Sequence, residues 1–148
     1  MILHAGLVAR RLAGRWRGAL IEGTAGAGKS DLALRAMDAG WRLVADDRVI
    51  VFNSGGGLFG RAPVSLAGRL EARSVGILTM PHLPLAEISF VVRCAESRDE
   101  LARLPAADTR TILAIALPRI SLLALDASAP ALLAAAIRWL GGGRQAEY

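Results

Sequence analysis

The segment GTAGAGKS at residues 23–30 decides the fold class of this 148-residue chain. It fits the pattern G-x-x-x-x-G-K-[ST] in full. A short apolar stretch at residues 18–22 precedes it, and leucines and alanines recur at helical spacing from Lys29 to Ala39. A strand, a glycine-rich loop and a helix in this order form a phosphate-binding loop, because backbone N–H groups at the positive end of the helix point at phosphate oxygens. We therefore predict an α/β fold built around a nucleotide site.

Lys29 is the only lysine in the chain, and all other basic residues are arginine. A compact ammonium on a flexible stem reaches between the β- and γ-phosphates, where the planar fork of arginine does not fit. Ser30 is predicted to supply a hydroxyl ligand to Mg²⁺. The predicted nucleotide-binding residues are Gly23, Thr24, Ala25, Gly26, Ala27, Gly28, Lys29 and Ser30. The alternative is a glycine-rich turn that only caps a helix.

Composition narrows the remaining functions. The length fits a single domain at residues 1–148, and no uninterrupted apolar run reaches the roughly 18 residues that a membrane span needs. The first residues lack the order of a signal peptide, so we expect a cytoplasmic protein. The net charge is +5, but the arginines are scattered and aromatic residues are few, so we expect no nucleic-acid binding. Cys94 is the only cysteine and lies in an apolar run, which predicts a core residue and no internal disulfide.

The other segments predict a mixed sheet with few helices. An apolar strand at residues 2–9 and the strand at residues 18–22 are expected to form a hairpin. A closing helix is expected at residues 128–140, with Ser128 as its N-cap and Pro130 in its first turn. Further strands are expected at residues 41–45, 48–52, 74–80, 87–94 and 119–125, a turn at residues 53–57, a loop or short helix at residues 95–104, and a flexible tail at residues 141–148.

Two adjacent aspartates, Asp46 and Asp47, follow the expected strand after the phosphate-loop helix. In open α/β sheets, ligands bind at the carboxyl ends of strands. One carboxylate would hold Mg²⁺, directly or through water, and the other would accept a proton from an attacking hydroxyl. The alternative is that one caps a turn and the other is solvated. His4 lies in the first expected strand, where a hydrogen bond to one of these aspartates and a purely structural role are both open.

These features together resemble the catalytic domain of HPr kinase/phosphorylase, a bacterial enzyme family that phosphorylates a serine of the phosphocarrier protein HPr. The resemblance rests on four segments that cover most of the chain. They are LHAGLVA at residues 3–9, GTAGAGKSDLALRAMDAGWRLVADDRV at residues 23–49, GRAPVSLAGRLEARSVGIL at residues 60–78, and LPRISLLAL at residues 117–125. The resemblance implies an α/β P-loop kinase domain of HPr kinase type, with a mixed sheet and few flanking helices.

The resemblance also implies roles for individual residues. Asp46 would be the general base that deprotonates the acceptor serine, and His4 would be positioned against it. Arg73 would help to position phosphate and Lys29 would act in catalysis. The residues implied at the Mg²⁺ site are Ser30, Asp47 and Glu71. The cofactors implied are ATP and Mg²⁺, the partner is an HPr-like phosphocarrier protein of the sugar phosphotransfer system, and the family forms hexamers.

Three departures from the family pattern refine this expectation. The N-terminal domain of the long forms does not precede this segment, so the chain resembles the short form found in alphaproteobacteria. Ser74 stands where the family signature has glycine, and Ala72 replaces isoleucine. The segment at residues 81–90 is shorter than the family's mobile loop, which is tied to phosphorolysis. We therefore predict the kinase reaction, whereas the sequence does not decide whether the reverse reaction is retained.

Two other functions fit the same residues. The first is a P-loop kinase or NTPase that acts on a different substrate. The second is a nucleotide-binding regulatory module without transfer chemistry, in which bound nucleotide alters contacts with a sensor kinase or another signalling partner.

Overall fold

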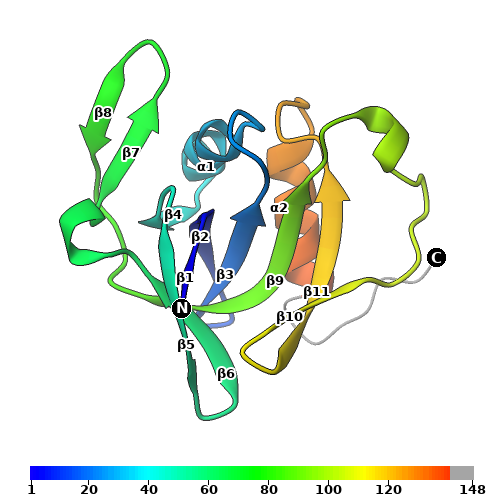
Figure 1. Cartoon of the computed structure of the whole chain (residues 1–148), viewed down its shortest axis with the longest axis horizontal. Helices are drawn as coiled ribbons and strands as arrows, with labels where there is room; N and C mark the ends of the chain where they lie inside the picture. Colours follow the sequence, from blue (N-terminus) through cyan, green and yellow to red (C-terminus); the bar gives the residue numbers. More distant parts are fainter. Residues whose placement is uncertain (141–148) are drawn as a thin grey trace.

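The glycine loop at residues 23–30 lies between strand β3 (Arg15–Glu22) and helix α1 (Lys29–Asp38), as the sequence predicted. The computed structural model describes residues 1–140 (Figure 1), so the tail expected at residues 141–148 lies outside the described residues. The predicted closing helix is α2 (Ala129–Trp139). Ser128 is its N-cap residue, although the serine side chain makes no capping hydrogen bond. No helix within residues 1–140 is long and apolar enough to cross a membrane.

The remaining elements are strands and two short 3₁₀ turns. Besides β3, the strands are β1 (Ile2–Leu3), β2 (Ala5–Leu12), β4 (Arg42–Ala45), β5 (Val49–Ser54), β6 (Gly57–Arg61), β7 (Arg69–Ala72), β8 (Gly76–Thr79), β9 (Ala86–Cys94), β10 (Thr109–Ile112) and β11 (Ile115–Leu122). Strands β7 and β8 pair with each other in a separate two-stranded sheet. The 3₁₀ turns are η1 (Val64–Leu66) and η2 (Arg98–Glu100).

A mixed sheet with the strand order β1-β5-β6-β9-β3-β2-β4 forms the centre of the molecule, and β11 and β10 extend it beside β9. Strands β3, β9 and β11 are parallel, and their arrowheads point the same way at the top of Figure 1. Their carboxyl ends therefore meet at one edge of the sheet, which is where open α/β sheets bind ligands. The glycine loop leaves β3 at this edge.

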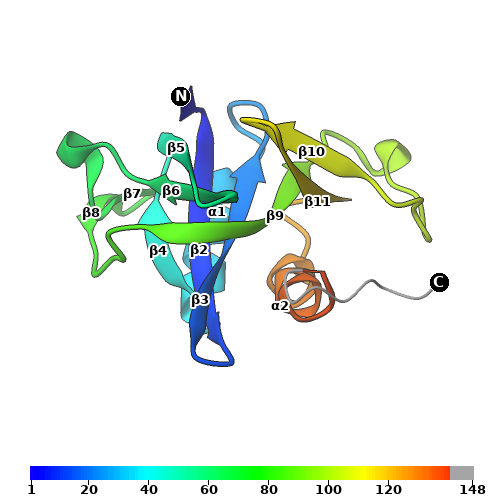
Figure 2. The ribbon, with the colours of Figure 1, turned by 90° about the horizontal axis from the view of Figure 1, so that it is seen from below.

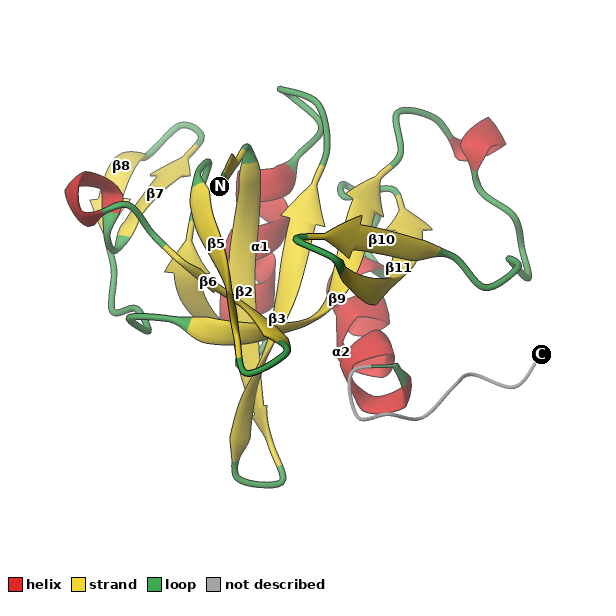
Figure 3. Ribbon diagram, turned by 60° about the horizontal axis from the view of Figure 1, so that its bottom comes forward, coloured by secondary structure: helices red, strands yellow, loops and turns green. Residues whose placement is uncertain are grey.

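Alternating side chains on β3 divide the core between the two faces of the sheet. Ala19 and Ile21 pack in one cluster with both helices, whereas Leu20 packs in the other cluster. The second face is covered by the β5–β6 and β10–β11 hairpins, which lie in front of the sheet in Figure 3 while the helices lie behind it. Figure 2 shows the same division from below, with α2 and the β10–β11 hairpin on opposite sides of β9.

A β-bulge in β9 keeps this division consistent. Gly18 pairs with Ile88, but the next residue of β3 pairs with Phe90, so Ser89 is an extra residue in β9. An extra residue reverses the alternation of the strand. As a result, Ile88 packs on the hairpin face and Phe90 on the helix face, although they are two residues apart.

The hairpin before the glycine loop is longer than the sequence predicted. Strand β2 continues to Leu12 and β3 begins at Arg15, so the turn is only Ala13 and Gly14, both with positive φ (49° and 76°). A two-residue turn with two left-handed residues matches the twist of an antiparallel pair, and the arginines around it extend the strands rather than the loop. His4 was expected within a strand, but it lies in the break between β1 and β2.

Three strands were not predicted as such: β6, β7 and β10. The β10–β11 hairpin turns at Leu113 and Ala114, whose φ angles are 49° and 64°. Neither residue type favours the left-handed region, so the sequence contains no turn signal there. The turn expected at residues 53–57 is confined to Gly55 and Gly56, and the glycine that follows already belongs to β6.

The bulge makes the two glycines of the β2–β3 pair differ in their tolerance of a side chain. A Cβ at Gly18 would lie 2.8 Å from the backbone oxygen of Glu87, whereas a Cβ at Gly6 would meet only atoms at 3.8 Å or more. We expect Gly18→Ala to lower the free energy of unfolding by about 1–3 kcal/mol, because the β3–β9 pairing must shift. Gly6→Ala is the matched control and should stay within about 1 kcal/mol of wild type. Chemical denaturation measures both, and equal stability of the two variants would contradict this packing.

Candidate functional site

The glycine loop has the backbone of a phosphate cradle. Gly26 and Gly28 have φ angles of 82° and 97°, which residues with a Cβ rarely adopt. Lys29 Nζ donates hydrogen bonds to the carbonyl oxygens of Gly23 (2.7 Å) and Thr24 (2.9 Å), so the ammonium lies across the mouth of the loop. The loop therefore presents backbone N–H groups and one compact positive charge together, as phosphate binding requires.

Cys94 forms the floor beneath the start of the loop. A Cβ at Gly23 would lie 2.8 Å from Cys94 Cβ, so only glycine fits there. Cys94 is buried, and burial raises the pKa of its thiol to about 11. The thiol is therefore neutral and unreactive at physiological pH, which confirms the prediction that this residue belongs to the core.

Asp46 is the one buried charged side chain of residues 1–140, with 6% of its surface exposed. Its Oδ1 accepts a hydrogen bond from Ser30 Oγ (2.8 Å), and its Oδ2 accepts one from the backbone N–H of Glu71 (3.3 Å). Burial raises the pKa of Asp46, although these two hydrogen bonds act in the opposite direction. The side chain thus joins the first turn of α1, the end of β4 and the start of the β7–β8 hairpin.

Asp47 has a different environment from its neighbour. Its side chain is 68% exposed and its φ is 67°, a conformation that aspartate tolerates better than most residues. Its nearest charged partner is Arg48, whose Nε lies 3.8 Å from Asp47 Oδ2. The two aspartates are therefore adjacent in sequence but differ in solvation.

His4 lies beside this turn. The backbone N–H of Ala5 donates to the carbonyl of Asp47 (3.2 Å), which holds the β1–β2 break against the aspartates. The hydrogen-bond partner of His4 in the structure is Arg48, with 3.4 Å between His4 Nε2 and Arg48 Nη1. Sequence reasoning missed Arg48, and it placed His4 against Asp46. No hydrogen bond joins these two side chains in the described part of the chain, and the role implied for His4 stays a prediction.

A pocket of about 240 Å³ brings all three predicted metal-site residues together. Its lining comes from α1, the β4–β5 turn, η1 and the β7–β8 hairpin. The residues are Ser30, Asp46, Asp47, Leu66, Arg69, Leu70, Glu71 and Ile77. Arg73, which the family resemblance placed near phosphate, is exposed in the turn of the β7–β8 hairpin and does not line this pocket. The next residue, Ser74, has a φ of 73°, which gives a physical reason for glycine in the family signature.

The oxygen atoms of this pocket fit Mg²⁺ bound together with phosphates. Mg²⁺ prefers oxygen ligands and is usually held by one or two carboxylates plus substrate phosphates rather than by an all-protein cage. Residues 1–140 contain no group of three or more His, Cys, Asp and Glu side chains arranged for a metal. Ser30 gives its only proton to Asp46, so its oxygen lone pairs remain available to a cation.

A second pocket, of about 330 Å³, lies on the other side of β3. It is bounded by the glycine loop and by the loops that follow β9 and β11. Its lining is Thr24, Ala25, Gly26, Ala27, Ala95, Glu96, Leu123, Ala124, Leu125 and Asp126. Sequence reasoning did not identify the last six of these. The predicted strands at residues 87–94 and 119–125 end near them, so strand ends were the available signal.

Comparisons with known proteins agree with this geometry. The solved structure of the Hpr(Ser) kinase/phosphatase from Coxiella burnetii matches with a TM-score of 0.80 at 24% identity, and the match covers 93% of this chain and 88% of that chain. This likeness confirms the predicted fold, an α/β P-loop kinase domain of HPr kinase type with a mixed sheet and few helices.

Sequence comparison identifies relatives of greater identity over shorter segments. The HPr kinase/phosphorylase of Clostridium tetani is 46% identical over 66 residues, 45% of this chain and 22% of that protein. The HPr kinase/phosphorylase of Mycoplasmopsis pulmonis is 38% identical over 82 residues, 51% of this chain and 26% of that protein. The matched region thus spans about a quarter of the length of these curated relatives. A profile of the HPr Serine kinase C-terminal domain matches residues 13–124, well over half of the chain, and the chain belongs to this family.

Proposed function

We propose that this chain transfers the γ-phosphoryl group of ATP to a serine hydroxyl of an HPr-like phosphocarrier protein. The observation that carries the proposal is the hydrogen bond between Ser30 and the buried Asp46, next to a glycine loop whose lysine lies at its mouth. The glycine loop, the hydroxyl of Ser30 and the candidate base Asp46 therefore lie together, at the first turn of α1 and the end of β4.

In the proposed reaction, the serine oxygen of the partner attacks the γ-phosphorus. The bond from the γ-phosphorus to the bridging oxygen breaks, and ADP leaves with the bonding electron pair. Asp46 accepts the proton of the serine hydroxyl. Lys29 and the backbone N–H groups of the loop stabilise the charge that develops on the phosphate oxygens.

Asp46 has properties that suit a proton acceptor. Its raised pKa increases its affinity for a proton, and its Oδ2 accepts one long hydrogen bond, so it keeps a free lone pair. Ser30, Asp47 and Glu71 are the residues proposed to hold Mg²⁺. A bound Mg²⁺ would supply positive charge at the β- and γ-phosphate oxygens.

The proposed partner follows from the family. The curated relatives are HPr kinase/phosphorylases, so we infer an HPr-like protein as the phosphoryl acceptor and regulation of the sugar phosphotransfer system as the outcome. We place the reaction in the cytoplasm.

The segment between β8 and β9 is short, and the backbone N–H of its Leu83 donates to the carbonyl of Leu43 on β4 (2.8 Å), so it lies along the sheet edge. We therefore propose the forward reaction alone. Assembly into oligomers and contact with a sensor kinase stay proposals.

The proposal predicts that Lys29 cannot be replaced even by arginine. Lys29→Ala should reduce transfer of label from γ-labelled ATP to a candidate HPr protein by at least about a hundredfold, because a single preorganised charge contact contributes roughly 3–4 kcal/mol. Lys29→Arg keeps the charge but should also reduce transfer strongly, because the planar guanidinium does not fit where the compact ammonium reaches between the phosphates. Arg138→Ala, which changes an exposed residue in the last turn of α2, is the control and should retain wild-type transfer. Near-normal transfer by either lysine variant would contradict the assignment. ATP turnover without a labelled partner would favour an NTPase, and binding without turnover would favour a regulatory module.

The burial of Asp46 predicts a pH-dependent effect of Asp46→Asn on stability. The pKa of Asp46 is raised in the folded protein above its ordinary value of 3.8, so the folded state binds more protons than the unfolded state in the interval between the two values. Wild-type stability therefore loses the contribution of this group as the pH rises through that interval. Asp46→Asn does not titrate, so it should gain stability relative to wild type as the pH rises, while transfer is lost. Urea denaturation at several pH values measures the difference, and parallel curves for the two proteins would refute the argument.

A further inference from the structure

The 330 Å³ pocket beside the glycine loop is built differently from the pocket that contains Asp46. Strands β9 and β11 lie on one side of β3, and β2 and β4 lie on the other, so the two pockets lie on opposite sides of the loop. The Asp46 pocket is lined by charged side chains, whereas the larger pocket is lined mainly by small and apolar ones. Its polar side chains are those of Thr24, Glu96 and Asp126.

Arg35 lies outside this pocket and donates hydrogen bonds to the backbone of one of its walls, residues 123–126. It lies in α1, the helix that follows the glycine loop, and its Nε donates to Asp31 Oδ2 (2.8 Å) one helical turn earlier. Its Nη1 donates to the backbone carbonyl of Asp126 (3.0 Å), and its Nη2 donates to the carbonyl of Ala124. One guanidinium thus binds the loop helix and the wall at residues 123–126 to each other.

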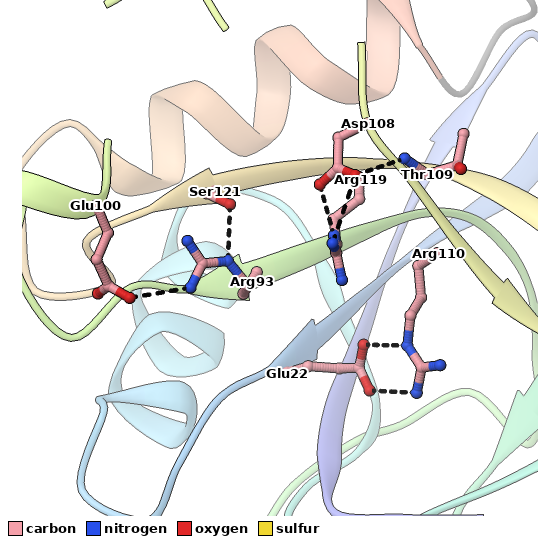
Figure 4. A network of polar contacts seen from close by, with 8 residues as sticks. All are labelled: Glu22, Arg93, Glu100, Asp108, Thr109, Arg110, Arg119 and Ser121. Carbon is pink, nitrogen blue, oxygen red and sulfur yellow. Dashed lines mark hydrogen bonds and ion pairs between the residues drawn. The ribbon is translucent and has the colours of Figure 1, made fainter. Parts of the chain in front are cut away.

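Further ion pairs hold the same wall and the wall opposite. Arg98 forms a bidentate pair with the carboxylate of Asp126 (2.9 and 3.1 Å). Glu100 accepts hydrogen bonds from the backbone N–H groups of Glu96 (2.5 Å) and Ser97 (3.0 Å), and it is itself paired with Arg93 (3.3 Å; Figure 4). The walls are therefore positioned by side chains outside the pocket, which leaves its interior free.

Leu125 connects this wall to the glycine loop. A Cβ built on Gly28 would lie 2.8 Å from Leu125 Cδ2, so the leucine side chain rests on the backbone of the loop. Even so, Leu125 is 68% exposed. A large apolar side chain that lies against a phosphate loop and also faces solvent presents a surface suited to the apolar face of a bound molecule.

We propose that this pocket holds the nucleoside half of the nucleotide and that Arg35 is a positioning residue, which keeps the wall at residues 123–126 against the glycine loop. The proposal rests on the proposed nucleotide site. The phosphates occupy the loop backbone and the transferred group faces Asp46, so the nucleoside extends to the side away from the carboxylates. The apolar wall there contacts the base, and Arg35 fixes the distance between this wall and the phosphates.

The test separates the nucleoside from the phosphates. The probes are the β,γ-imido analogue of ATP and inorganic tripolyphosphate, each titrated with Mg²⁺ into the full chain by calorimetry. Arg35→Met removes every donor but keeps an unbranched side chain, and Arg138→Met on α2 is the matched control. We expect Arg35→Met to weaken binding of the ATP analogue about tenfold and to change tripolyphosphate binding by less than about twofold, because hydrogen bonds from a charged donor to two carbonyls are lost. Arg138→Met should change neither.

A second variant tests the pocket without altering the hydrogen bonds of Arg35. Leu125→Ser changes an exposed side chain, so the fold does not depend on it, and it should also weaken the ATP analogue selectively. Equal weakening of both probes in either variant, or no weakening of the ATP analogue, would overturn the proposal. Equal affinity of the wild type for the two probes would overturn the nucleoside pocket alone, whereas binding of neither probe would overturn the proposed function itself.

Discussion

The carboxylate of Asp46 is the constraint on which the rest of the site depends. A buried charge is stable only when its oxygens are hydrogen-bonded, because transfer of an unpaired carboxylate out of water costs several kcal/mol or more. Donors to Asp46 include the hydroxyl of Ser30 and the backbone N–H of Glu71, which belong to α1 and β7. One side chain therefore fixes the phosphate-loop helix and the β7–β8 hairpin relative to the end of β4. Displacement of either element would remove one of the hydrogen bonds that stabilise this buried carboxylate.

The arginines of this chain also fix the relative positions of the groups that they contact. Arg119 forms a forked contact with the carboxylate of Asp108, and Arg110 forms one with the carboxylate of Glu22, the last residue of β3 before the glycine loop. Exposed pairs of this kind contribute little to stability individually, but a planar fork sets an orientation as well as a distance. Lys29 differs from these arginines, because its compact ammonium donates to two carbonyls of its own loop and, in the proposed reaction, to the phosphates. The restriction of lysine to this one position reflects that difference.

The sequence predicted those parts of the fold that have a strong local pattern. The glycine loop, α1, α2 and the buried strands are confirmed, because apolar periodicity and a glycine motif are encoded in consecutive residues. The β10–β11 hairpin was missed because Leu113 and Ala114 adopt left-handed conformations that only the tertiary structure stabilises. Side-chain partners were equally out of reach. No local sequence pattern predicts that Arg48 lies between His4 and Asp47. Nor does any local pattern predict that Arg35 contacts Asp126 in the loop after β11, because the two residues are 91 positions apart in the sequence.

The two adjacent aspartates show how the fold distinguishes residues that the sequence cannot. Asp46 continues β4 inward, where burial raises its pKa, whereas the positive φ of Asp47 turns the chain and leaves its carboxylate in solvent. Two carboxylates that differ in burial are suited to separate tasks, so the proposed proton acceptor is the buried one. Asp46 also directs the proton of Ser30 towards itself, which leaves the lone pairs of that hydroxyl for a cation in the pocket that both aspartates line. In the proposed reaction, the same buried carboxylate orients the cation ligand and receives the proton, so phosphate binding and proton transfer would both depend on one position at the end of β4.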